Sequence, residues 1–287
     1  VFKISYLGLY PILDLDFLKT KKKSTLSNDS KNYDVEWDEK ELKIGVKIPL
    51  SYTKSKYMTY YLFESNYSMT KLENIYSPLF PGTVTLNYDD INYLTNTVYY
   101  SRLHKKTKRN VYYPWGQTVL FQHKVMTDRS DFSGYYFRAS SFFDFPGFKE
   151  THSFRLNLNY ENQTQKGYAF ANSISLISGL DNNNKFKKAV VAEIEYELPI
   201  IYPHIHVGPI LNIQRIRYTS FINTAMIEGI DSNDDYVEER PFGFGGELYF
   251  DVNFFRQTSV FNLGVRWSYI NLMSKPKIEL LLSSITF

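Results

Sequence analysis

Residues 191–200 read VAEIEYELPI, and this stretch carries the signal that decides the fold. Apolar residues fill every second position, and Glu193, Glu195 and Glu197 stand between them. Because successive side chains of a β-strand point to opposite faces, this period of two predicts a strand with one apolar and one charged face. No long stretch shows helical spacing, so the chain is predicted to be all-β. The same alternation recurs at residues 42–52, 154–163, 247–254 and 261–269.

The composition excludes several classes of protein and of functional site. Cysteine is absent, which excludes a disulfide scaffold, a thiolate metal site and a cysteine nucleophile. The 33 basic and 30 acidic residues leave a net charge of +3, too small to predict a nucleic-acid partner. No run of about 18 apolar residues is present, so no transmembrane helix is predicted. Aromatic residues make up 17% of the chain, and many cluster near the ends of the expected strands, as in the aromatic girdles of outer-membrane barrels.

The expected strands are long. Most exceed the roughly 5–6 residues usual in soluble sheets and reach the roughly 9–11 that a tilted membrane-spanning strand needs. We place them near residues 2–19, 40–52, 57–70, 83–88, 91–104, 115–126, 132–145, 152–163, 168–178, 188–201, 205–222, 241–255, 259–272 and 277–287.

The connections between these strands are expected to alternate in length. Short ones fall at 53–56, 89–90, 127–131, 164–167, 202–204 and 256–258. Longer ones fall at 20–39, 71–82, 105–114, 146–151, 179–187 and 223–240. Bacterial barrels combine short periplasmic turns, longer outer loops and an even strand count.

These features together predict a transmembrane antiparallel up-and-down β-barrel of about 14 strands, within a range of roughly 12–16. The barrel is expected to form one domain over residues 1–287, with both termini on the periplasmic side. Without a signal peptide, the chain is expected to be mature, cytoplasmic or cut from a longer one, and the abrupt, strand-like start favours a trimmed or processed N-terminus. It could then be the C-terminal part of a longer chain. A soluble β-protein with a large aromatic core is the alternative reading of the same alternation.

The C-terminus resembles the terminal strand of bacterial outer-membrane barrels, which the barrel-assembly machinery recognises in that family. Phe287 ends the chain, and Ile285 and Leu281 fit the apolar positions upstream of it, whereas Ser283 and Glu279 do not. The resemblance implies an assembly signal at Phe287, Ile285 and Leu281.

A wider resemblance covers roughly residues 110–287. The run YPWGQ at 113–117, the FPGF turn at 145–148 with the following His152-Ser153, and the final glycine-containing hairpin are similar to barrel domains of Bacteroidota outer-membrane proteins. Those barrels are loosely similar to the bacterial surface antigen superfamily of outer-membrane assembly and secretion factors. The superfamily's arginine-glycine-tyrosine/phenylalanine lid motif is not visible, and ISGL at 177–180 lies about where it would fall. This departure counts against insertase activity.

Charged residues on the predicted inward faces form the main candidate site. Glu193, Glu195 and Glu197 make a column of carboxylates on one strand. They could pair across strands and fill the interior, or form a charged constriction that selects ions. The other expected lumen-lining charges are Arg138, Arg155, Arg266, Lys43 and Lys47.

One neighbouring pair illustrates the predicted register. Val252 is placed on the lipid face and Asp251 in the lumen. Arginine on the lipid face at the midplane costs about 2–4 kcal/mol, whereas lumen changes tune properties instead. Val252→Arg is therefore expected to disrupt assembly more than Asp251→Arg.

Two histidine motifs resemble functional sites, but each lacks a feature that such a site needs. His204 and His206 have a spacing that can bind zinc or copper, but no third ligand is in sight. His152 and Ser153 suggest a hydrolase, yet adjacent strand residues point to opposite faces and cannot form a base–nucleophile pair.

Two charged loops are expected on the outer side. The bases Lys105, Lys106, Lys108 and Arg109 could meet lipopolysaccharide phosphates or remain solvated. The acidic residues within 231–239 could hold calcium, but they lack the glycine and terminal glutamate of a calcium loop. No catalytic residue, metal or cofactor is predicted.

The preferred hypothesis is a non-enzymatic protein of the bacterial outer membrane. It would act as a pore, as an export or assembly component, or as the membrane anchor of a larger complex. Expected partners are outer-membrane lipid and lipopolysaccharide, the barrel-assembly machinery, and other outer-membrane or periplasmic subunits. The alternatives are a barrel enzyme of the lipase or protease type and a soluble secreted β-protein that binds glycans.

Overall fold

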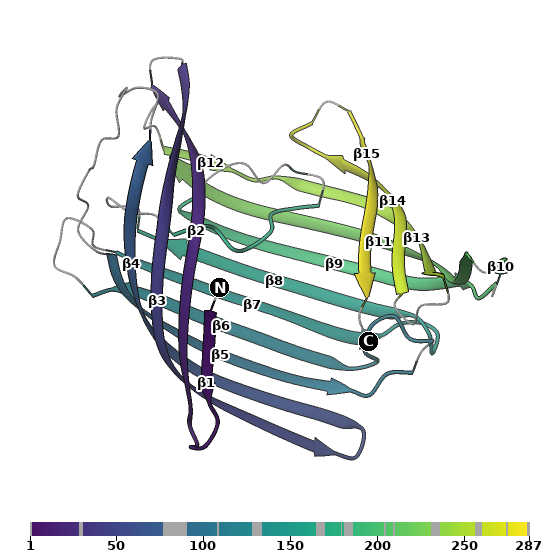
Figure 1. The fold of residues 1–287 in the computed structure, drawn as a ribbon. Coiled ribbons are helices and arrows are strands. Elements are labelled where there is room, and N and C mark those ends of the chain that lie inside the picture. The colour runs from purple at the N-terminus through teal and green to yellow at the C-terminus, as the bar shows by residue number, and fades with distance from the viewer. Residues whose placement is uncertain are drawn as a thin grey trace.

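The computed structural model describes most of the chain (Figure 1). Within the described residues, fifteen β-strands belong to one sheet, and every strand pair within it is antiparallel. The described residues are 2–28, 31–76, 91–107, 109–127, 134–164, 170–178, 180, 186–203, 205–208, 210–230, 236–255, 260–273 and 275–285.

The strands follow one another along the sheet in chain order. Two short strands, β10 and β12, lie off this path and pair with β11. The bounds are β1 Phe2–Tyr6, β2 Ile12–Asn28, β3 Lys31–Lys54, β4 Tyr57–Tyr76, β5 Ile91–His104, β6 Gly116–Met126, β7 Tyr135–Pro146, β8 Ser153–Gln163, β9 Lys188–Ile201, β10 Ile205–Val207, β11 Leu211–Ile230, β12 Tyr236–Glu239, β13 Phe242–Phe254, β14 Val260–Ile270 and β15 Lys277–Ile285.

The sheet curls into a barrel-like shape, as expected for an up-and-down barrel (Figure 1). The strands β1–β3 and β13–β15 form its two sides nearest the viewer, and β5–β9 form the wall behind them. Within the described residues, β1 pairs only with β2 and β15 only with β14, so no ladder joins the two edges.

The two faces of the sheet have the polarity opposite to that of a soluble protein. Large apolar side chains on the convex face are exposed, including Ile194 at 51% and Ile222 at 56%. Charged and polar side chains on the concave face are buried, including Asp144 at 0% and Glu197 at 1%. A soluble β-protein with an aromatic core would show the reverse arrangement.

The expected strand at 2–19 is wrong, because the chain reverses within it. β1 and β2 pair antiparallel across residues 7–11, with Tyr6 opposite Leu13. Pro11 ends this turn, and proline has no N–H to offer a continuous ladder.

Three segments that were expected to be loops are largely strands instead. Residues 20–39, 71–82 and 223–240 contain the extensions of β2, β3, β4 and β11, together with β12. Their polar composition suggested loops, but cross-strand ion pairs such as Lys21–Glu36 and Lys22–Glu39 accompany the ladder. Opposite charges placed across an antiparallel pair stabilise it.

The expected strand at 168–178 is also wrong. Residues 170–178 have no strand pairing and cross the concave side of the sheet as an irregular segment (Figure 1). The alternation of apolar residues there is satisfied by packing against the wall and not by a ladder. The expected strand at 83–88 lies outside the described residues, and β4 pairs directly with β5.

These changes reassign the ends of the barrel. We call the end that carries residues 55–56, 105–107 and 147–152 the turn end, and the opposite end, which carries residues 170–178, the loop end. The expected outer loops 105–114 and 146–151 therefore share an end with 53–56, and 127–131 belongs with the longer loops. β1 and β15 run in the same direction, so the chain does not start and finish at one end as expected.

Candidate functional site

The candidate site is the concave face of the sheet, on which the eight expected charges lie; that they line a lumen stays a prediction. Each carboxylate of the β9 column has partners of its own. Glu193 accepts hydrogen bonds from Asn157 and Asn223, each at 3.3 Å. Most of the expected bases are paired as well: Lys43 with Glu41, Lys47 with Asp14, Arg155 with Asp144 and Arg266 with Glu247, while Arg138 donates to Ser140.

A group of buried charges lies nearer the turn end, and sequence reasoning missed it in part. Asp251 accepts from Arg215 at 2.6 Å and from Arg217 at 3.1 Å, and Arg217 also bonds Glu197. The Arg217 guanidinium stacks 4.1 Å from the ring centre of Tyr249. These contacts link β9, β11 and β13 through one ionic network.

A bulge explains why simple alternation did not place these arginines. The β11–β13 register shifts between Ile213 and Arg215, so two odd-numbered neighbours on β11 point to opposite faces. A β-bulge inserts one residue into one strand and re-aims the side chains that follow.

The connection between β5 and β6 enters the interior at the turn end. The Tyr112 hydroxyl donates to Glu195 at 2.8 Å, and the Arg155 guanidinium lies 3.5 Å from the centre of the Tyr112 ring. Burial, and then the nearby carboxylates Glu195 and Glu197, raise the pKa of Tyr112 well above its ordinary value. Tyr112 is therefore a neutral hydrogen-bond donor at any physiological pH.

Two side chains hold the β5–β6 connection next to the ionic network by donating to one of its backbone carbonyl groups. The carbonyl oxygen of Arg109 accepts from Arg215 at 3.3 Å and from Tyr202 at 3.0 Å. Burial, and then the charges of Arg215 and Arg155, lower the pKa of Lys106 in this connection. The expected basic outer loop thus lies at the turn end and faces the interior in part, while Lys108 is outside the described residues.

The segment of residues 170–178 closes over the interior near the loop end. Glu161 on β8 anchors it, accepting from the backbone N–H groups of Ser173 at 2.9 Å and Ile174 at 3.1 Å. Asn172 and Tyr136 donate to the same carboxylate, at 2.6 and 3.1 Å. A buried carboxylate that receives several hydrogen bonds replaces the ladder that this segment lacks.

Apolar packing holds the segment against the wall. Ile174, Leu176, Ile177 and Phe186 form one buried cluster with inward residues of three strands. Those strand residues are Ala189 and Val191 of β9, Ala225 and Ile227 of β11, and Ile270 of β14.

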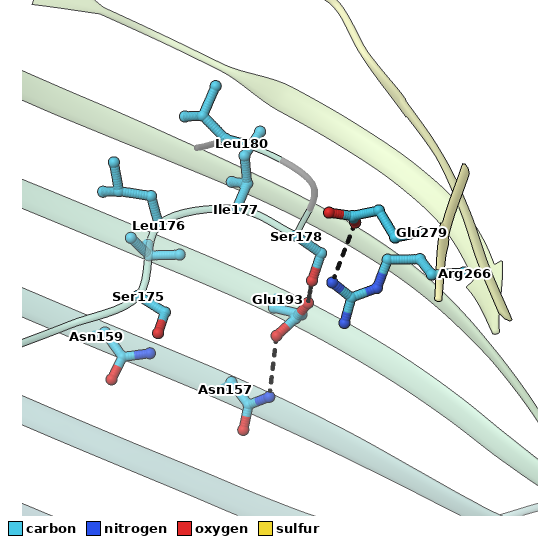
Figure 2. A pocket seen from close by; sticks show the side chains of 11 residues that line it. Asn157, Asn159, Ser175, Leu176, Ile177, Ser178, Leu180, Glu193, Arg266 and Glu279 are labelled. Carbon is cyan, nitrogen blue, oxygen red and sulfur yellow. Dashed lines mark hydrogen bonds and ion pairs between the residues drawn. The ribbon is translucent and has the colours of Figure 1, made fainter. Parts of the chain in front are cut away.

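A cavity of about 370 Å³ remains between this segment and the sheet (Figure 2). Ser178 points to Glu193, to which it donates at 3.2 Å, and Arg266 lies 3.6 Å from its cross-strand neighbour Glu279 on one side of the cavity. Every charge in its lining has a partner, so the cavity is a polar gap between packed segments.

The remaining candidates do not come together. His206 lies on β10, and His204 is outside the described residues. Ser153 is buried on the concave face. His152 lies on the other side, where its Nδ1 and the Tyr196 hydroxyl share a hydrogen bond of 2.6 Å. No group of three histidines or carboxylates that could hold a metal occurs among the described residues. Of the acidic residues in 231–239, Glu238 pairs with Arg240 and residues 231–235 are not described.

The expected assembly signal is only partly visible. Leu281 alternates with Ile278, Leu280 and Leu282, which are exposed on the convex face at 72–87%. Leu281 therefore shares the concave face with Glu279, opposite to a lipid-facing apolar row. Phe287 lies outside the described residues.

Comparisons with known proteins show the fold. No protein-family model and no curated protein matches the sequence. Among solved structures, CdiB from Escherichia coli is similar with a TM-score of 0.58 and 10% identity over 98% of this chain. BamA from Haemophilus ducreyi lacking POTRA domains 1–3 has a TM-score of 0.48, with 12% identity over 99% of this chain. The chain spans 51% of that CdiB chain and 66% of that BamA chain.

The likeness to CdiB places the chain among antiparallel barrel folds. In the part of the chain that the structure describes, no helix is long and apolar enough to cross a membrane.

Proposed function

We propose that the chain is the membrane-spanning barrel of a bacterial outer-membrane protein whose interior is occupied by its own segments. The observation that carries this proposal is the reversed polarity of the sheet, with apolar side chains exposed outside and ion pairs buried inside. Water would penalise so large an exposed apolar surface, whereas lipid favours it. A β-sheet satisfies its backbone in lipid by closing into a barrel, and the curl and fold of this chain fit that requirement.

Its role is export or assembly of other proteins, or anchoring of a larger complex, and it is not enzymatic. The fold likeness to CdiB supports the barrel, while the role rests on the resemblance of the C-terminal half to surface antigen barrels. Lipopolysaccharide, the barrel-assembly machinery and further envelope subunits are the partners that such a role implies. An open pore is disfavoured because two segments of the chain enter the interior from opposite ends.

Fractionation and conductance test the proposal together. The protein should stay with outer membranes through a carbonate wash, and its purified form should shift on a heat-modifiability gel. In planar bilayers it should conduct little, and Glu161→Ala should raise conductance because the segment at 170–178 loses its anchor.

The matched control is Glu228→Ala, which removes a carboxylate paired with Lys188 at the same end of the barrel. Conductance of this control should stay at the wild-type level. Recovery of the protein in solution without detergent would overturn the membrane barrel, and a large steady conductance of the wild type would overturn the occupied interior.

A further inference from the structure

A groove on the convex face at the turn end combines basic and aromatic side chains. It has a volume of about 540 Å³ and follows the ends of β3, β4 and β5. Three of its residues are basic and none is acidic. The lining residues are Tyr52, Lys54, Ser55, Lys56, Tyr57, Thr59, Tyr61, Tyr100 and Arg102.

The strand register brings the bases and rings to one spot. Lys54 is opposite Tyr57 on the β3–β4 ladder, and Arg102 is opposite Thr59 on the β4–β5 ladder. The Arg102 guanidinium lies 4.6 Å from the centre of the Tyr57 ring. Stacking of this kind holds the planar group by its face and leaves its N–H edges free to bind an anion.

Aromatic rings frame the groove on both sides. Tyr61 lies 6.4 Å from Tyr52 and 5.0 Å from Tyr100, measured between ring centres. Tyr57 and Arg102 also line a neighbouring cavity of about 150 Å³, together with Trp115 and Phe145. Tyrosine and tryptophan favour the level of lipid headgroups, where one end of the ring is wet and the other dry.

The surface next to the groove is apolar. Phe63 and Val98 follow on the same face towards the middle of the strands, and both are more than two-fifths exposed. A ligand with an anionic headgroup and two hydrocarbon chains would fit this surface. Its charge would pair with the bases of the groove, and its chains would pack on Phe63 and Val98.

We propose that the groove binds the phosphate headgroup of an anionic glycerophospholipid, an inference that rests on the proposed membrane barrel. Lys54, Lys56 and Arg102 bind the phosphate by charge-assisted hydrogen bonds, and the tyrosines pack against the glycerol region. The lipid comes from the periplasmic leaflet because the groove lies at the end with the shorter connections, which faces the periplasm in bacterial barrels. Lipopolysaccharide, which carries phosphate in the outer leaflet, is the competing source.

Quenching of tryptophan fluorescence tests the site directly. Trp37→Phe and Trp267→Phe leave Trp115, beside the groove, as the single tryptophan of the chain. The purified barrel in detergent micelles is titrated with phosphatidylglycerol that carries brominated acyl chains. Quenching should be half complete at a lower mole fraction than with brominated phosphatidylcholine.

The key variant carries Lys54→Gln, Lys56→Gln and Arg102→Gln in this background. We expect its half-quenching mole fraction to rise about tenfold or more, since each base near a lipid surface adds to the attraction. The matched control carries Lys19→Gln, Lys21→Gln and Lys71→Gln, three exposed bases of the convex face towards the loop end, and should titrate like the wild type.

The outcomes separate the proposals. Equal titration of the key variant and the wild type, or an equal loss in the control, would overturn the site while leaving the barrel intact, as judged by heat modifiability. Displacement of the brominated lipid by unlabelled lipopolysaccharide at lower concentration than by unlabelled phosphatidylglycerol would overturn the periplasmic source. Solubility of the wild type without detergent would instead overturn the proposed function itself.

Discussion

The two halves of the barrel interior are filled by different physical means. Near the turn end, Asp251, Arg215, Arg217 and Glu197 form a buried ionic network that contacts the β5–β6 connection through the Arg109 carbonyl. Near the loop end, an apolar cluster that includes Ile177 packs like the core of a soluble protein. The stability of the ionic half depends on every charge keeping its partner. The stability of the apolar half depends on how well side-chain volume is filled, so it tolerates changes of shape better.

The largest expected effect is in the ionic half. Asp251→Ala leaves two buried arginines without their shared carboxylate, and breaking such a pair costs about 3–5 kcal/mol. A urea titration in detergent, followed by heat-modifiable mobility, should show a clearly lower midpoint. The control Asp16→Ala removes a partly exposed pair with Lys3, worth about 0–1 kcal/mol, and equal midpoints for the two variants would contradict the network.

The same network revises one expectation drawn from the sequence. Asp251 lies on the concave face as predicted, but it is bonded to two arginines, and Val252 is only 2% exposed. Asp251→Arg would place a third positive charge among them. We now expect it to lower folded yield at least as strongly as Val252→Arg.

The next effect lies in the apolar half. Ile177 is 3% exposed, so Ile177→Ala should cost about 2–5 kcal/mol of local packing and release the segment from the wall. Limited proteolysis of the folded protein should then cut within residues 170–178 faster than in the wild type. Leu272→Ala removes an exposed leucine at the same end and should leave the cleavage pattern unchanged.

The smallest effect tests the contact between the β5–β6 connection and Glu195 of β9 at the turn end. Tyr112→Phe keeps the ring beneath Arg155 and removes only the hydrogen bond to Glu195, a loss of about 0.5–1.5 kcal/mol or somewhat more for a charged acceptor. Hydrogen exchange should speed up at residues 109–113 and stay unchanged at 170–178. Faster exchange in both segments would show that the halves are coupled.

The sequence predicted the strand faces well and the connections poorly. Alternation placed Glu193, Arg155 and Lys47 on the concave side because a period of two survives any error in strand ends. It failed at residues 168–178, where apolar residues alternate but Glu161 supplies the backbone partner in place of a neighbouring strand. No local pattern reports a contact between a connection and the inward face of the strands.

The long hairpins were not predicted because their strands look like loops in sequence. Residues 20–39 are so rich in charge that they resemble a solvated loop, yet cross-strand pairs such as Lys21–Glu36 match charges of opposite sign. Such pairing is visible only once the register is known. The inward arginines of β11 were hidden by the bulge beside Ile213.

Spin-label accessibility along β9 in lipid vesicles tests the central claim most directly. The chain has no cysteine, so Val190→Cys, Ala192→Cys, Glu193→Cys, Ile194→Cys and Glu195→Cys each give one labelling site. Labels at 190, 192 and 194 should collide with oxygen, which concentrates in lipid, and those at 193 and 195 should be shielded from it. Alternation with a period of two would support an apolar face in lipid and a filled polar interior, whereas equal access of a water-soluble nickel reagent to both sets would contradict it.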